Sequence, residues 1–315
     1  MNAKNLFKCV CAGLVVTFIA GSAWAQTDPL YMSDGDARKI IVVQSGTIVD
    51  SFPASPQERA FPIAIVETVR TTGYWPGESG GEYELDGTPT GAVYKLMEPE
   101  GGMSDGTTDG EFNYAITFNG GHVWVYDEEW ANGQLLFSAG GRWGGIAYDA
   151  TDDTFWVSAD RAAGMRHYDR NGNLLGEFPT EPNLDWNLAL EPSSGTLWVS
   201  TYRTNRLHNY AKDGTHLGTI EVPGMNASSF FSGEFQFGGG GCGEKAKLKA
   251  KCPKNGAKVK GKLRKATPNI QVTFKLDGGQ PVQGVTNNKG KAKAKWTKQV
   301  PGGHTVTVCD LEEKC

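Results

Sequence analysis

The chain has 315 residues, and its 31 Lys and Arg nearly balance its 35 Asp and Glu, for a net charge of −4. After the first 25 residues no apolar stretch is long enough for a membrane-spanning helix. The small net charge hides a division, because residues 26–243 hold 12 Lys and Arg against 30 Asp and Glu, whereas residues 244–315 hold 17 against 5. An acidic body is therefore joined to a basic one, which predicts different partners for the two parts or attraction between them.

The first 25 residues have the pattern of a signal peptide. Lys4 and Lys8 form a basic start, residues 9–20 are apolar, and the small-residue motif 23–25 suits a cleavage site. We expect a mature chain that begins at Gln26 and is exported to a secreted, periplasmic or cell-surface location.

A strand–turn–strand pattern recurs five times after this segment, most clearly in residues 165–178 and 207–220. The copies are marked by turn glycines at steps of 41, 46, 39 and 42 residues, namely Gly46, Gly87, Gly133, Gly172 and Gly214. A period near 40 residues with hairpin chemistry is typical of β-propeller blades. We expect residues 26–237 to form an all-β propeller of about five blades, with room for a sixth between residues 98 and 113.

The ends of the repeat predict how the ring closes. Residues 30–52 lack the leading strand that residues 144–153 and 187–195 supply to later copies. One strand, within residues 225–237, is left over at the other end. It should pair with residues 30–52, because closure removes open sheet edges.

The innermost strand of each blade should start at the axial mouth, the usual ligand site of a propeller. The residues predicted to line this mouth are Asn113, Arg142, Trp143, Asp185, Trp186 and Asn187. They could hold a sugar or a peptide by stacking and hydrogen bonding, or could be packing residues and strand caps.

A glycine-rich acidic segment, residues 105–111, offers hard oxygen ligands for calcium from Asp105 and Asp109. The alternative is a plain acidic surface loop. Asp149, Asp152 and Asp153 form a similar, weaker cluster. No other cofactor is predicted.

Catalytic motifs are missing from the sequence, which contains neither G-x-S-x-G nor H-E-x-x-H. His167 and His208 are assigned the same position in two repeats, which indicates a structural role for both. No catalytic residue is predicted.

The basic part begins after a glycine linker, residues 238–241, and occupies residues 242–315. Its lysines alternate with small or apolar residues, which is typical of strands with one charged face. With turn residues between the strands, this predicts a small immunoglobulin-like β-sandwich.

The lysine rows have three interpretations: solvated faces that protect strand edges, a face that binds anionic polymers or a cell surface, and a surface that docks on the acidic propeller. The residues assigned to the polyanion face are Lys245, Lys247, Lys249, Lys289, Lys291, Lys293 and Lys295. Sequence-specific nucleic-acid reading is not expected, because no nucleic-acid motif accompanies the lysines.

Four cysteines remain after the signal peptide, and their spacings lack the paired knuckles of a zinc site. Two disulfides are therefore expected to support the small domain, with three pairings open. We favour Cys252–Cys309 and Cys242–Cys315.

The GIAYD strand at 145–149, the LWVS strand at 197–200 and the YDRNGNLLG hairpin at 168–176 resemble the broad YVTN/NHL family of secreted propellers. The KLKAKC and TNNKGKAKAKW stretches, 247–252 and 286–296, resemble lysine-rich C-terminal modules of secreted bacterial proteins. The second resemblance implies no catalysis.

The first resemblance implies a binding platform or, alternatively, a metal-dependent lactonase-like hydrolase. In that alternative, the candidate metal ligands are Asn113, Asp185 and Asn187, with Asp149 in reserve and Glu67 as the nearest glutamate. We expect an exported, non-enzymatic binding protein, with an unidentified protein or glycan ligand at the propeller.

Overall fold

The computed structural model describes residues 26, 28–54, 56, 58–97, 101–159, 164–180, 185–201, 204–226, 231–237, 246–252, 258–266, 271–277, 279, 282–287, 289–297, 299–300, 302–309 and 311–315. The predicted signal peptide and glycine linker lie outside these residues. Every regular element in the described ranges is a strand. These ranges contain no helix that is long and apolar enough to cross a membrane.

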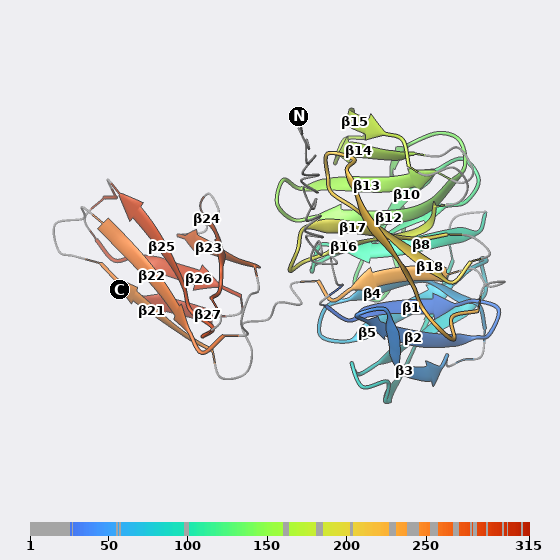
Figure 1. Cartoon of the computed structure of the whole chain (residues 1–315), viewed down its shortest axis with the longest axis horizontal. Coiled ribbons are helices and arrows are strands. Elements are labelled where there is room, and N and C mark those ends of the chain that lie inside the picture. The colour runs from blue at the N-terminus through green and yellow to red at the C-terminus, as the bar shows by residue number, and fades with distance from the viewer. Residues whose placement is uncertain are drawn as a thin grey trace, which may run out of the picture.

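Five four-stranded antiparallel sheets make up the part before residue 238 (Figure 1). From the inner strand outward they are β20 (Phe231–Phe235), β1 (Leu30–Asp34), β2 (Lys39–Gln44), β3 (Thr47–Pro53); β4 (Ala60–Ile65), β5 (Val69–Gly73), β6 (Ser79–Tyr83), β7 (Pro89–Lys95); β8 (Met103–Thr108), β9 (Asn113–Thr117), β10 (His122–Tyr126), β11 (Gln134–Ser138); β12 (Trp143–Asp149), β13 (Thr154–Ala159), β14 (Met165–Asp169), β15 (Leu174–Phe178); and β16 (Asp185–Glu191), β17 (Thr196–Thr201), β18 (Arg206–Tyr210), β19 (His216–Glu221).

The inner strands form a closed ring, because β4, β8, β12, β16 and β20 each contact the next and β20 returns to β4. The fold is therefore a β-propeller of five blades. The sixth blade considered for residues 98–113 does not form, since Met103–Thr108 is the inner strand of the third blade.

Ring closure through the termini is confirmed. β20 pairs antiparallel with β1, from Leu30 opposite Phe235 to Asp34 opposite Phe231. The late strand thus supplies the inner strand that the first copy of the repeat lacks.

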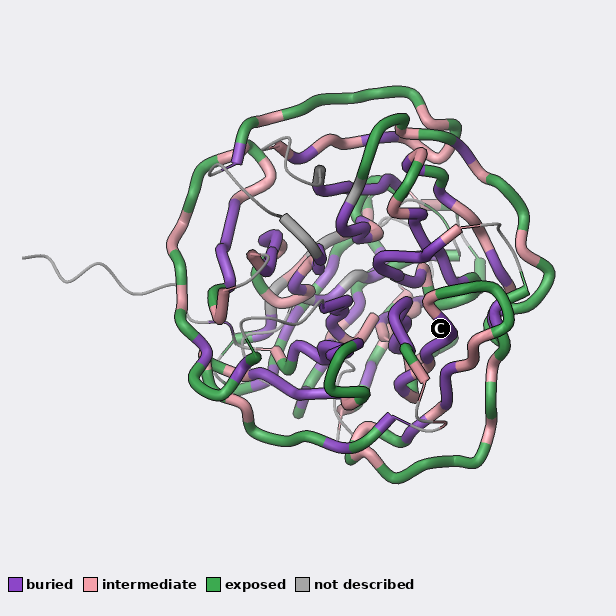
Figure 2. The backbone as a smooth tube through the Cα atoms, turned by 90° about the vertical axis from the view of Figure 1, so that its right-hand side faces the viewer, coloured by how far each residue is buried: buried purple, intermediate pink, exposed green. Residues whose placement is uncertain are grey.

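The turn glycines of the repeat also join neighbouring blades. Gly172 has φ +79°, and a Cβ added there would lie 2.5 Å from Cβ of Phe137 in the preceding blade. Gly87 and Gly214 face Phe52 and Phe178 in the same way. Figure 2, turned by 90° from Figure 1, shows exposed segments around the rim and buried segments gathered inside.

Residues 246–315 form a separate β-sandwich. One sheet holds β21 (Lys247–Lys251), β22 (Lys258–Arg264) and β25 (Ala292–Thr297), and the other holds β24 (Val282–Val285), β23 (Gln271–Leu276), β26 (Thr305–Val308) and β27 (Leu311–Lys314). Their facing residues share one core, which includes Leu248, Val259 and Leu263 from the first sheet and Phe274 and Val306 from the second. The likeness to an immunoglobulin domain stays a prediction.

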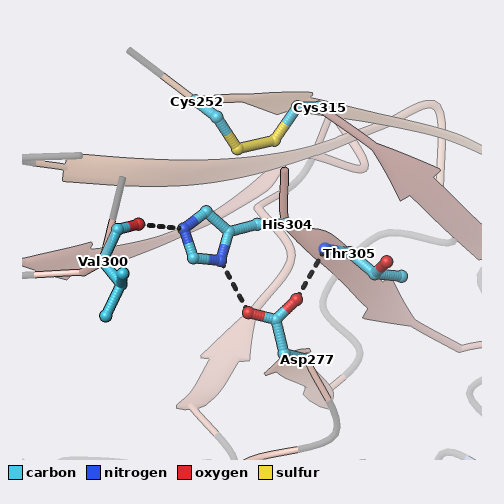
Figure 3. The surroundings of a disulfide bond; sticks show 6 residues. All are labelled: Cys252, Asp277, Val300, His304, Thr305 and Cys315. Atoms are coloured by element: carbon cyan, nitrogen blue, oxygen red, sulfur yellow. Dashed lines mark hydrogen bonds and ion pairs between the residues drawn. A yellow bond between two sulfur atoms is a disulfide. The ribbon is translucent and has the colours of Figure 1, made fainter. Parts of the chain in front are cut away.

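The two sheets are joined by a disulfide between Cys252 and Cys315, with their Cα atoms 5.4 Å apart (Figure 3). Both favoured pairings, Cys252 with Cys309 and Cys242 with Cys315, are therefore wrong. The chain turns back after β26 as β27, and backbone hydrogen bonds between His304 and Cys315 place the last residue beside β21. Cys309 is also disulfide-bonded, and Cys242 lies outside the described residues.

Candidate functional site

The sheet β21–β22–β25 places its basic side chains in register across three strands. Lys251 lies opposite Lys260, which lies opposite Lys295 on the other side, and Lys249, Lys262 and Lys293 form the next row. The set, called here the lysine face, comprises Lys247, Lys249, Lys251, Lys258, Lys260, Lys262, Arg264, Lys293 and Lys295. Directly opposed side chains in such a ladder have Cβ atoms about 4.5–5.5 Å apart.

These charges repel one another. The pKa of Lys262, at the centre, lies below its usual value, chiefly because of Arg264 and further because of neighbouring lysines such as Lys293 and Lys291. No Asp or Glu occurs in the three strands. The lysine face is therefore a continuous positive surface, exposed at every position except half-buried Lys262.

Five of the seven lysines predicted for a polyanion face lie in or directly beside the sheet β21–β22–β25. Lys247, Lys249, Lys293 and Lys295 belong to the lysine face, and Lys291 directly precedes β25. The remaining two lie elsewhere: Lys289 is in the turn before β25, where Asn287 accepts its backbone N–H, and Lys245 is outside the described residues. The prediction missed the cations of β22, because the sequence does not show which strand is central.

The predicted axial mouth is not one group of residues. Asn113 begins β9, a second strand, and lies opposite Thr108 at the end of inner strand β8. Asn187 is instead the third residue of inner strand β16. Asn113 was therefore misplaced, because it lies beside the end of an inner strand, whereas Asn187 lies near the start of one.

The remaining mouth candidates lie at or near the start of inner strands. Arg142 stacks over the Phe118 ring at 4.2 Å and precedes β12. Buried Asn187 accepts the backbone N–H of Ser200 at 2.6 Å. Trp143 and Asp185 start β12 and β16, with Trp186 next along β16, and the side chains of all three lie outside the described part.

Asp105 occupies the propeller axis rather than a loop. Its side chain is fully buried in β8, and its Oδ2 accepts the N–H groups of Ile146 at 3.1 Å and Leu188 at 2.9 Å. Its Oδ1 accepts the hydroxyl of Ser232 at 2.6 Å and the N–H of Gly233 at 3.1 Å. One carboxyl thus joins the inner strands of four blades.

Glu234, on β20, is a second buried acid near this position that sequence reasoning missed. Burial raises its pKa well above the usual value, and the charge of Asp105 adds to the effect. Burial also raises the pKa of Asp105 to about 7, although its four donors favour the ionised form. Because both acids are buried away from water, Glu234 is favoured in its neutral form at neutral pH.

Asp109 is one of a series of contacts between blades. Its carboxylate accepts the hydroxyl of Tyr114 at 2.7 Å and pairs with Arg170, which belongs to the next blade. Arg70 and Glu128 link the second and third blades in the same way, at 3.1 Å. The calcium interpretation of Asp105 and Asp109 is therefore wrong, because one carboxyl is enclosed at the axis and the other binds a guanidinium.

The weaker acidic cluster has a different composition from the one expected. Asp149 and Asp152 lie with His167 in the one metal-compatible group among the described residues, whereas Asp153 pairs with Arg170. Buried Asp149 accepts the indole N–H of Trp156 at 3.3 Å and pairs with Lys212. Burial lowers the pKa of His167, which keeps its imidazole neutral near pH 7.

The equivalence assigned to His167 and His208 is wrong by one residue. In the fourth blade Trp156 lies opposite His167, and in the fifth Trp198 lies opposite Asn209. Because side chains alternate along a strand, His208 points to the other side of its blade. The structural role inferred for His167 from this equivalence therefore falls away.

No protein-family model and no curated protein matches the chain. Solved structures with some likeness include the nidogen/laminin complex (13% identity, 65% of this chain and 97% of that one, TM-score 0.45) and virginiamycin B lyase from Staphylococcus aureus (13%, 85% and 94%, 0.41). A protein from Bacteroides caccae has 12% identity over 75% of this chain and 82% of its own, with a TM-score of 0.42. Likenesses this weak carry no argument about function.

Proposed function

We propose that this is an exported, non-enzymatic binding protein whose basic sandwich attaches it to anionic polymers or an anionic cell surface. The observation that carries the proposal is the position of the charges on the lysine face. Edge protection would need lysines on the outer strands only. The central strand β22 has no free edge and carries the most cations, Lys258, Lys260, Lys262 and Arg264.

Solubility is a poor explanation for the same pattern. Surfaces charged for solubility mix both signs, and like charges opposite one another in a ladder destabilise the sheet. A ladder of cations does suit a repeating anion, whose binding releases counterions and depends steeply on salt. The propeller then serves as the platform for a protein or glycan.

The lactonase-like alternative receives no support from the positions of its predicted ligands. Asn113 lies on β9 beside the end of inner strand β8, whereas Asn187 lies near the start of inner strand β16. We therefore keep binding as the proposed function.

The test is heparin binding by the full mature chain, measured by calorimetry at several salt concentrations. A face variant replaces with Gln the centre of the ladder, Lys260, Lys262, Lys293 and Lys295. A control variant removes four charges outside the lysine face, Lys95, Lys265, Lys275 and Lys314.

We expect the face variant to bind about tenfold more weakly or worse, with a shallower salt slope, and the control to stay within about threefold of wild type. The control should keep the unfolding temperature, because exposed charges contribute little to stability. The face variant should keep or slightly raise it, because the four charges that it removes repel one another. Equal loss in the two variants would mean that net charge alone, and not the lysine face, determines binding.

A further inference from the structure

The fourth blade brings three metal-ligating side chains to one point. Asp149 ends β12, Asp152 lies in the following turn and His167 is on β14, and one ligand atom from each lies within 4.8 Å of the others. His167 Nε2 is 3.9 Å from Asp152 Oδ2. We propose that these residues form a binding site for a divalent transition metal, with Zn²⁺ as its best occupant.

The next blade shows that the propeller does not need this group for its architecture. The repeat places Glu191 where Asp149 stands, Ser194 where Asp152 stands, and Asn209 where His167 stands. The bond from the blade tryptophan to the acid is kept in both blades, at 3.3 Å from Trp156 and 3.1 Å from Trp198. Asp152 and His167 are thus additions of the fourth blade relative to the fifth.

The donor set selects the class of metal. One imidazole nitrogen with two carboxylates suits Zn²⁺, whereas calcium prefers oxygen ligands alone. The ring of His167 is held in place by stacking on Trp156, with centroids 4.1 Å apart and planes at 1°. Ligand atoms around zinc lie at about 2.0–2.2 Å from the ion, so the three side chains must close slightly, which exposed Asp152 allows.

A hydroxyl and an ammonium contact the side chains that would bind the ion. Thr154 Oγ1 lies 2.6 Å from His167 Nε2 and donates to Asp152 at 2.6 Å, so it joins two of the ligands. The ammonium of Lys212, from the fifth blade, contacts Asp149 and lies 3.2 Å from Thr151 Oγ1. A metal ion supplies the same positive charge, so Zn²⁺ and Lys212 should compete for Asp149.

The competition gives a direct test on the full mature chain, without an affinity tag, by calorimetric titration with Zn²⁺ alone. His167→Asn installs the residue that the fifth blade carries at this position, so the fold should tolerate it. It should weaken binding at least tenfold. Lys212→Met removes the competing ammonium and should tighten binding about tenfold.

His208→Asn is the matched control, since it removes an imidazole from the neighbouring blade that has no place in the group. It should bind Zn²⁺ as wild type does, and Ca²⁺ should not replace Zn²⁺ in a competition titration. The proposal is overturned if wild type binds no Zn²⁺, if His167→Asn binds it unchanged, or if Lys212→Met has no effect. Thermal unfolding of each apo variant checks that the blades remain folded.

Discussion

Substitution of Asp105 should show how much of the propeller depends on one buried carboxyl. Asp105→Ala leaves three backbone N–H groups and the Ser232 hydroxyl without their acceptor in the interior. Each stranded donor costs about 1–3 kcal/mol, so the loss should be about 4 kcal/mol or more. That is a large part of a total stability that is usually about 5–15 kcal/mol.

Asp105→Asn should cost less, about 1–3 kcal/mol. The amide oxygen still accepts from Ile146 and Leu188, and its NH2 group can donate to Ser232, so that Gly233 loses its acceptor. Glu234→Gln is the control for the second buried acid. A neutral glutamate must take up a proton on folding at pH 7, and a glutamine of the same shape need not, so this substitution should not destabilise the propeller.

Urea unfolding followed by tryptophan fluorescence at pH 7 gives these differences. The pH dependence adds an independent check, because the pKa of Asp105 is raised to about 7 in the fold and returns near 3.8 on unfolding. The folded state then binds more protons between these values, so wild-type stability should fall as pH rises from about 4 to 7. Asp105→Asn should make this slope shallower, and the raised pKa of Glu234 should account for the part that remains. The reasoning fails if Asp105→Ala unfolds like wild type, or if Glu234→Gln costs as much.

Two further predictions concern the packing between neighbouring blades and the disulfide of the sandwich. Gly172→Ala should destabilise the propeller by about 1–3 kcal/mol in thermal unfolding, because its φ is +79° and a Cβ would strike Phe137. Gly176 has open space around it, so Gly176→Ala should have a much smaller effect. Similar losses in the two variants would contradict the packing argument. Non-reducing peptide mapping should recover Cys252 linked to Cys315, and Cys252→Ser should lower stability by about 2–5 kcal/mol; a Cys252–Cys309 peptide would contradict the fold of the sandwich.

Ring closure could be predicted from the repeat of the sequence, and strand alternation from the period of two within each segment. The leftover strand near the end of the repeat had one vacant position to fill, and it pairs there with Leu30–Asp34. The single-sided lysines of Lys247–Lys251 follow directly from the period of two. Such features need only the composition of a segment and its repeat.

Asp105 could not be recognised in the same way. Its partners lie 41, 83, 127 and 128 residues away in the sequence, and an Asp-Gly pair ordinarily indicates a turn. Here Gly106 is needed in a strand, because a Cβ would lie 2.9 Å from the backbone nitrogen of Ile63. The predicted equivalence of His167 and His208 failed for a simpler reason. An alignment offset of one residue moves a side chain to the other face of a strand.

The lysine face opposes the stability of the small sandwich in its unbound state. Its central residue, Lys262, already has a lowered pKa because neighbouring cations oppose its charge, so the unbound sheet forms against repulsion. The opposing contributions are one compact core and the link from Cys252 to Cys315, which joins the charged sheet to the other one. A bound polyanion would remove the repulsion and leave these contributions in place. The arrangement is therefore better suited to the bound state than to the free one, as expected of a surface whose charges serve binding.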